Sequence, residues 1–103
     1  MKNHLIHFHQ MDWEHPMEGV AQKIHSNGQR RLRLIRFSAG FTEHVWCTKG
    51  HVGFVVSGKM HIDFNGELKD YRQGDGLWIE KGEAHKVTVG SDGAVELILF
   101  EDV

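Results

Sequence analysis

Apolar and polar residues alternate over short stretches of this chain, with turn signals between them. In residues 60–64, three apolar side chains alternate with two polar ones, which is the period of two expected of a half-buried β-strand. The dipeptides Asn27-Gly28 and Asn65-Gly66 each stand between two such stretches. Asn-Gly favours the positive φ angles of a type I′ hairpin turn. Apolar stretches divided by frequent turn residues are typical of an all-β sandwich or barrel.

The same pattern predicts strands along the whole chain and leaves little room for helices. Residues 11–20 hold one helical turn at most, because Pro16 and Gly19 oppose a longer helix. Strands are expected at residues 20–25, 31–38, 44–48, 51–57, 60–64, 67–71, 77–79, 85–89 and 95–100. A chain of 103 residues without a repeat or linker fits a single domain over residues 1–103.

Two of the expected strands carry apolar residues on both faces. Residues 31–37 place leucines on one face and Ile35 and Phe37 on the other, and residues 95–100 are apolar at nearly every position. A second sheet covers one face, but a barrel of this size cannot cover the other as well. The uncovered face is therefore expected to pair with a second copy, giving a homodimer.

Charge and composition restrict the classes of function. The formal net charge is -2 and the sequence pI is about 6.5, so there is no basic surface of the kind that binds nucleic acid. No apolar run reaches the roughly 20 residues of a membrane span, and residues 1–7 lack the apolar core of a signal peptide. The single cysteine, Cys47, cannot form an intramolecular disulfide. These features predict a cytoplasmic protein with neither nucleic acid nor membrane as a partner.

Candidate chemistry gathers in the stretch His44-Val45-Trp46-Cys47-Thr48-Lys49-Gly50-His51, and His85 opens a later strand. Histidines from different strands of a barrel can converge on one ion, and neutral imidazole suits Zn, Cu, Fe and Ni. In an extended strand, His44 and Trp46 share one face while Cys47 lies on the other. Cys47 is therefore expected to be a structural thiol, unless a bulge reverses its direction and offers a thiolate.

The spacing of the glycines and histidines resembles that of the cupins. The first cupin motif runs from a glycine through H-x-H and a glutamate to a second glycine, and residues 40–58 are similar to it. The second motif runs from a glycine through P-x-G and a histidine to an asparagine, and residues 74–89 resemble it. His44 and His85 match the first and last histidines of the two motifs.

Two positions in the cupin metal set differ in this chain. Trp46 stands where the second motif histidine is expected, and His51 stands where the glutamate is expected. An imidazole keeps a donor atom at the glutamate position. The resemblance thus implies a jelly-roll β-barrel in which His44, His51 and His85 bind a divalent transition metal (Zn, Fe, Ni, Mn or Cu). Trp46 is expected to form a wall of the small-molecule pocket, because its indole offers a large apolar face.

The resemblance leaves two classes of function open. One is a metal-dependent enzyme of the isomerase or dioxygenase type that acts on a small carbonyl or enol compound. No catalytic residue stands out, and Glu43, Glu83 and Tyr71 are general-base candidates by residue type alone. The alternative is a non-catalytic, metal-free ligand-binding or sensor barrel. Loss of the second motif histidine favours the barrel without metal, and histidines at the three other positions favour the metal.

Overall fold

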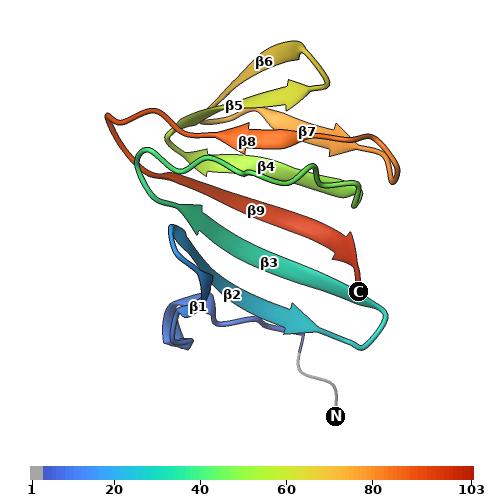
Figure 1. The fold of residues 1–103 in the computed structure, drawn as a ribbon. Coiled ribbons are helices and arrows are strands. Elements are labelled where there is room, and N and C mark those ends of the chain that lie inside the picture. Colours follow the sequence, from blue (N-terminus) through green and yellow to red (C-terminus); the bar gives the residue numbers. More distant parts are fainter. Residues whose placement is uncertain (1–3) are drawn as a thin grey trace.

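The computed structural model describes residues 4–103, and nearly all of their regular secondary structure is β-strand (Figure 1). The elements are η1 (Phe8–Gln10, a 3-10 turn), β1 (Glu14–Met17), β2 (Val20–Ser26), β3 (Arg30–Phe37), β4 (His51–Ser57), β5 (Lys59–Phe64), β6 (Glu67–Arg72), β7 (Gly76–Ile79), β8 (Lys86–Thr88) and β9 (Val95–Asp102). A six-stranded sheet has the order β1-β2-β3-β9-β4-β7, and a three-stranded sheet has the order β6-β5-β8. All the pairings are antiparallel, so the predicted all-β class is confirmed. Within the described residues, no helix is long and apolar enough to cross a membrane.

Both Asn-Gly dipeptides lie in hairpin turns, but their geometry differs. Asn65 and Gly66 have φ angles of 56° and 102° between paired residues of β5 and β6, as a type I′ turn requires. At the first hairpin only Gly28 has a positive φ, so the predicted type I′ turn is wrong there. The side-chain oxygen of Asn27 instead accepts the backbone N–H groups of Gln29 and Arg30, which closes a longer loop.

Two segments depart from the expected elements. Residues 14–17 form β1, a strand that was not expected within residues 11–20, and Pro16 is tolerated because β1 is the edge of its sheet. The strand expected at residues 44–48 is not continuous. That segment makes only isolated bridges, Thr42 to Thr88 and Cys47 to His85. Four residues lie between the two bridges on this segment and two on its partner, so the segment bulges after Glu43, whose N–H still donates to the carbonyl of Val87. The backbone path of residues 42–47 determines which of their side chains face the space between the two sheets.

The core lies between the two sheets, and alternation along β9 shows how it is built. Val95, Leu97, Leu99 and Glu101 are buried and face the three-stranded sheet, while the residues between them face outward. Thirteen hydrophobic residues are buried in this layer: Val20, Ile35, Phe37, Val55, Met60, Ile62, Leu77, Ile79, Val87, Val89, Val95, Leu97 and Leu99. The buried face of β9 therefore continues from the apolar core to an acidic residue at the carboxyl end of the strand.

The outer face of the six-stranded sheet is apolar and exposed. Phe54, Trp78 and Phe100 project from adjacent strands β4, β7 and β9, and their exposed fractions are 44%, 72% and 45%. The exposure of Phe100 agrees with the apolar outward face that the sequence predicts for residues 95–100.

Candidate metal and ligand site

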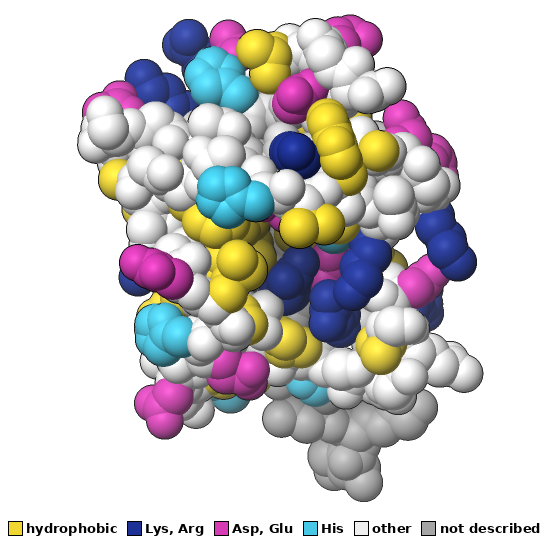
Figure 2. Space-filling view, viewed as in Figure 1, with side chains coloured by type: hydrophobic (Ala, Val, Ile, Leu, Met, Phe, Trp, Pro, Cys, Tyr) yellow, Lys and Arg dark blue, Asp and Glu magenta, His cyan; other side chains and the backbone are white. Residues whose placement is uncertain are grey.

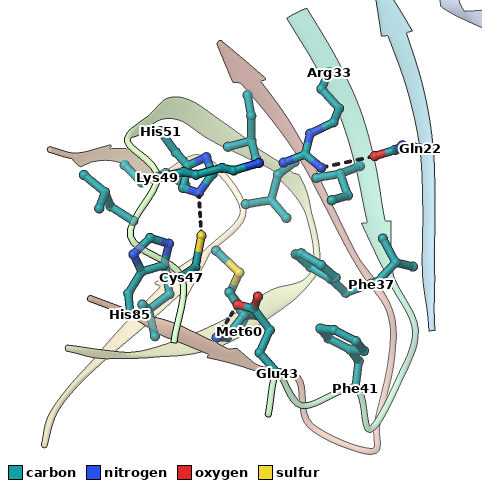
Figure 3. Close-up of a pocket in the computed structure, with 18 of the residues that line it drawn as sticks. Gln22, Arg33, Phe37, Phe41, Glu43, Cys47, Lys49, His51, Met60 and His85 are labelled. Atoms are coloured by element: carbon teal, nitrogen blue, oxygen red, sulfur yellow. Dashed lines mark hydrogen bonds between the residues drawn. The ribbon is translucent and has the colours of Figure 1, made fainter. Parts of the chain in front are cut away.

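A cavity of about 390 Å³ lies between the two sheets and has a polar and an apolar part (Figure 3). In the apolar part, the rings of Phe37 and Phe41 stack with their centroids 4.9 Å apart. The polar part is lined by Arg33, Lys49 and His51, among others. The volume falls within the roughly 300–1,000 Å³ of typical small-molecule pockets.

Three potential metal ligands meet in the wall of this cavity. The donor atoms of Cys47, His51 and His85 all lie within 4.8 Å of one another. Backbone hydrogen bonds fix two of these residues, since the N–H of Cys47 donates to the carbonyl of His85 and the N–H of His85 donates back, both at 2.9 Å. His51 enters from the first position of β4. The group is thus held by backbone pairing and by a sheet strand, which is the rigid support that a metal site needs.

Hydrogen bonds at Nδ1 orient both histidine rings. His85 Nδ1 donates to the carbonyl of Glu83 at 2.8 Å, and His51 Nδ1 contacts the Glu101 carboxylate. In each ring this leaves Nε2 as the nitrogen that can bind a metal, and His51 Nε2 lies 3.7 Å from the Cys47 sulfur. The partner at Nδ1 is the arrangement that fixes tautomer and ring direction in metal-binding histidines.

Glu101 links the histidine to two arginines. Its side chain is only 3% exposed, and it accepts from Arg31 Nε at 2.9 Å and from Arg33 Nη2 at 3.0 Å in addition to His51. Burial alone would raise the pKa of this carboxyl, but the hydrogen bond from His51, the charge of Arg33 and the contact with Arg31 together lower it to about 2. Glu101 therefore remains a carboxylate that can hold His51 in place.

The donor set and its spacing fit a divalent transition metal. A tetrahedral ion with a metal–sulfur bond of about 2.3 Å and a metal–nitrogen bond of about 2.0–2.1 Å separates the sulfur and nitrogen by about 3.6 Å. The separation between Cys47 Sγ and His51 Nε2 is 3.7 Å. One thiolate with two imidazoles suits zinc and other first-row metals with a preference for nitrogen and sulfur, and three protein ligands leave a position open.

His44 does not join this group. Its side chain is exposed and lies outside the cavity, whereas the cavity is lined by Phe41, Glu43, Cys47 and Lys49. Phe41, Glu43, Cys47 and Lys49 face the cavity, but Val45 between them is 78% exposed, so the segment does not alternate as a regular strand would. The expectation that Cys47 points away from the pocket is wrong, because the face assigned to the interior was the one that carries His44. Residues 48–50 between Cys47 and His51 are irregular, so no strand period in the sequence indicates the observed grouping.

Trp46 also lies outside the cavity wall. Its side chain is 39% exposed, and Lys86 Nζ lies 4.5 Å from its ring centroid in a cation–π contact. Aromatic walls are supplied instead by Phe37 and Phe41. The bulge at residues 44–46 carries the indole to the surface, and only the tertiary structure shows this.

One of the general-base candidates lines the cavity. Glu43 does so, and its Oε1 accepts the backbone N–H of Val87 at 2.9 Å. Tyr71 and Glu83 lie outside the cavity lining, and burial, followed by the charges of Asp75 and Glu83, raises the pKa of the Tyr71 phenol. Glu43 is the only one of the three with direct access to a molecule in this cavity.

Comparison with known proteins places this fold and site in a family. A family model described as the cupin domain matches residues 38–101, which is more than half of the chain. The chain therefore belongs to the cupins, as its motif spacing predicts. No curated protein matches the sequence at a significant level.

Solved structures share the fold over nearly the whole chain. KdgF from Halomonas sp. superposes with a TM-score of 0.82 at 18% identity, covering 99% of this chain and 96% of that chain. An RmlC-like cupin from Shewanella frigidimarina has a TM-score of 0.81 at 19% identity, with 98% and 91% covered. The polyketide cyclase RemF from Streptomyces resistomycificus has a TM-score of 0.83 at 15% identity, with 99% and 79% covered. At these identities the likeness shows the fold alone, and it confirms the jelly-roll architecture.

Proposed function

We propose that this cupin binds a divalent transition metal through Cys47, His51 and His85 and uses it on a small molecule held in the cavity between the sheets. The set keeps His51 and His85 from the sequence prediction and has Cys47 in place of His44. The observation that carries the proposal is the orientation of the two imidazoles: Nδ1 is engaged in each ring, His51 Nε2 lies beside the Cys47 sulfur, and the donor atoms of all three residues lie within 4.8 Å of one another. A hydrogen bond at Nδ1 fixes the tautomer and the direction of the ring, so that Nε2 can bind a metal.

The chemistry that such a metal supplies is Lewis-acid polarisation of a carbonyl or enol oxygen, or oxygen chemistry of the dioxygenase type. The residues of the chain contribute position and environment. Glu101 keeps His51 oriented, the Phe37–Phe41 stack provides an apolar surface, and Glu43 offers a carboxylate inside the cavity. An isomerase or a dioxygenase acting on a small carbonyl or enol compound is therefore the proposed class of enzyme.

Metal titration of the purified, untagged protein tests this proposal. Cobalt is a useful probe, because a cysteine thiolate bound to it gives a charge-transfer absorption in the near ultraviolet. We expect one equivalent of cobalt and this absorption in the wild type, loss of the absorption in Cys47→Ser, and much weaker binding in His85→Ala. His44→Ala is the matched control, since it removes a nearby exposed histidine, and it should bind like the wild type.

Two outcomes would contradict the proposed site. If the wild type binds no stoichiometric metal, the metal site is wrong. If His44→Ala weakens binding as much as His85→Ala does, the ligand set predicted from the sequence takes the place of the one proposed from the geometry. In either case circular dichroism of each variant establishes that the barrel is intact.

A metal-free ligand-binding barrel is the second candidate, and the apolar part of the cavity favours it. The Phe37–Phe41 stack with the neighbouring Met60 and Ile62 can hold an organic molecule by burial alone. Under this alternative the titration finds no metal, while an organic ligand still binds.

The apolar outer face of the six-stranded sheet supports a homodimer. Val52 pairs with both Trp78 and Phe100, so large apolar side chains from three adjacent strands form one surface. A second copy related by a two-fold axis would bury this surface against itself. A cytoplasmic location stays a prediction from the sequence.

A further inference from the structure

The polar part of the cavity is unusually rich in cations. Arg31, Arg33 and Lys49 all line it, and among the described residues that line the cavity Glu43 alone carries a carboxylate. In Figure 3, the ends of the Lys49 and Arg33 side chains point toward each other. Figure 2 shows Lys and Arg side chains gathered in a hollow on one face of the molecule.

The hydrogen bonds within the protein account for only part of this positive charge. Glu101 serves both arginines, accepting from Arg31 Nε and Arg33 Nη2, while Arg33 Nη1 donates to the neutral Gln22. Arg33 Nε is buried and has no hydrogen-bond partner within the described part of the chain. Lys49 has no carboxylate within ion-pairing distance among residues 4–103.

Glu43 does not neutralise this group. Its carboxylate lines the cavity near Phe41 and Met60, away from Arg33, and accepts the backbone N–H of Val87 (Figure 3). Arg31 and Arg33 thus share the single carboxylate of Glu101, and Lys49 has no carboxylate partner in the described part of the chain. Two cationic side chains directed at one another in a partly buried pocket repel, and an anion placed between them removes that repulsion and accepts charge-assisted hydrogen bonds.

From this arrangement we infer that the cavity binds a monocarboxylate with a compact apolar body. The carboxylate lies between Lys49 and Arg33, and the apolar body extends toward the stacked rings of Phe37 and Phe41. Lys49, which has no carboxylate partner among the described residues, can pair with the one carboxylate of such a ligand, and the cavity of about 390 Å³ accommodates a small organic acid. The inference deepens the proposed function, on which it rests for the metal end of the same cavity.

Lys49 connects this anion site with the proposed metal. It stands two residues before His51, and both side chains face the cavity. A carboxylate held by Lys49 therefore places the rest of the molecule beside the Cys47, His51 and His85 group. Substrate recognition and metal chemistry would then share one wall of the barrel.

Calorimetric titration with acids and their neutral amides tests the inference. The probes are phenylacetate, benzoate and hexanoate, each compared with its amide, in low-chloride buffer with EDTA, so that no metal contributes. We expect at least one acid to bind the wild type about tenfold or more tightly than its amide, because the amide cannot make charge-assisted hydrogen bonds. Lys49→Gln should remove that preference while leaving amide binding unchanged, and Lys49→Arg should restore most of it.

Lys81→Gln is the matched control, because Lys81 is exposed and lies outside this cavity. It should bind the acids as the wild type does. Arg33→Gln should weaken acid binding as well, but it also removes a partner of Glu101, so Lys49 gives the cleaner result. Thermal unfolding of each variant shows whether it remains folded.

Three results would overturn the inference. They are binding of none of the acids, equal binding of acid and amide, and an unchanged preference in Lys49→Gln. Inorganic phosphate is titrated as well, and phosphate binding without carboxylate binding would replace the proposed ligand class. If acids bind through Lys49 in EDTA but cobalt never binds, the metal proposal fails and this inference stands. If cobalt binds but the acids bind no more tightly than their amides, this inference fails and the metal proposal stands.

Discussion

Replacement of the Glu101 carboxylate by a neutral amide tests the charge network beneath the candidate site. Glu101→Gln keeps the shape of the side chain but removes the charge that holds Arg31, Arg33 and His51. The carboxyl is 3% exposed in its side chain, so little solvent screening weakens these contacts. Removal of one partner from a buried charged group costs about 3–5 kcal/mol, and the amide should recover part of this.

The pH dependence of the free energy of unfolding gives a second estimate of what the Glu101 carboxylate contributes. The pKa of Glu101 falls from 4.5 to about 2 on folding, because His51, Arg33 and Arg31 outweigh the effect of burial. Between these two pH values the unfolded chain carries a proton that the folded protein lacks, so stability rises with pH. The contribution is roughly 3 kcal/mol; it is present above the pKa of the unfolded chain and is lost as the pH falls toward the folded value.

Urea unfolding of the metal-free protein in EDTA, at several pH values from neutral to acidic, measures both effects. We expect the wild type to be more stable than Glu101→Gln at neutral pH, and the difference to shrink progressively below about pH 4.5. Glu96→Gln is the control, since Glu96 lies on the same strand, is 23% exposed in its side chain, and pairs with a single cation among the described residues, Arg36. Its cost at neutral pH should be about 1 kcal/mol or less. Parallel stability curves for the wild type and Glu101→Gln would refute the reasoning.

Three further predictions concern the metal, the assembly and the packing of the sheet. Metal should leave the protein as the pH falls from about 7 to about 5, because protons compete for imidazole and thiolate, while circular dichroism shows an intact barrel; metal retained at the lower pH would argue against the site. Light scattering should give the mass of a dimer at micromolar concentrations, and Phe100→Asp, on the exposed apolar face, should give a monomer; a monomeric wild type would exclude the homodimer. Gly53→Ala should cost about 1–3 kcal/mol or more in urea unfolding, because the added Cβ would lie 2.1 Å from the Ile98 carbonyl oxygen, whereas Gly93→Ala, with open space around its Cα, should cost less.

Local sequence patterns determine much of this fold. Alternation over residues 60–64 predicts β5, and Asn65-Gly66 predicts a turn that has the required positive φ angles. Both are short-range effects, because the side-chain period and the turn geometry depend on neighbouring residues only. The motif spacing in addition indicates the cupin family and directs attention to His51 and His85.

The grouping of the site is decided by the tertiary structure. Whether His44 or Cys47 faces the cavity depends on the bulge between the bridges at Thr42 and Cys47, and no local pattern marks that bulge. Parity in a strand states which residues share a face, but it does not state which face is buried.

The sequence alone does not show the charge network around Glu101. Glu101 meets Arg31, Arg33 and His51 across separations of 50 to 70 residues. They meet because β9 inserts between β3 and β4, and this pairing brings the carboxyl end of β9 beside the start of each neighbour. Patterns of neighbouring residues determined the strands and turns. The order of the strands in the sheets determined which charged side chains, metal-ligand candidates and aromatic rings lie together.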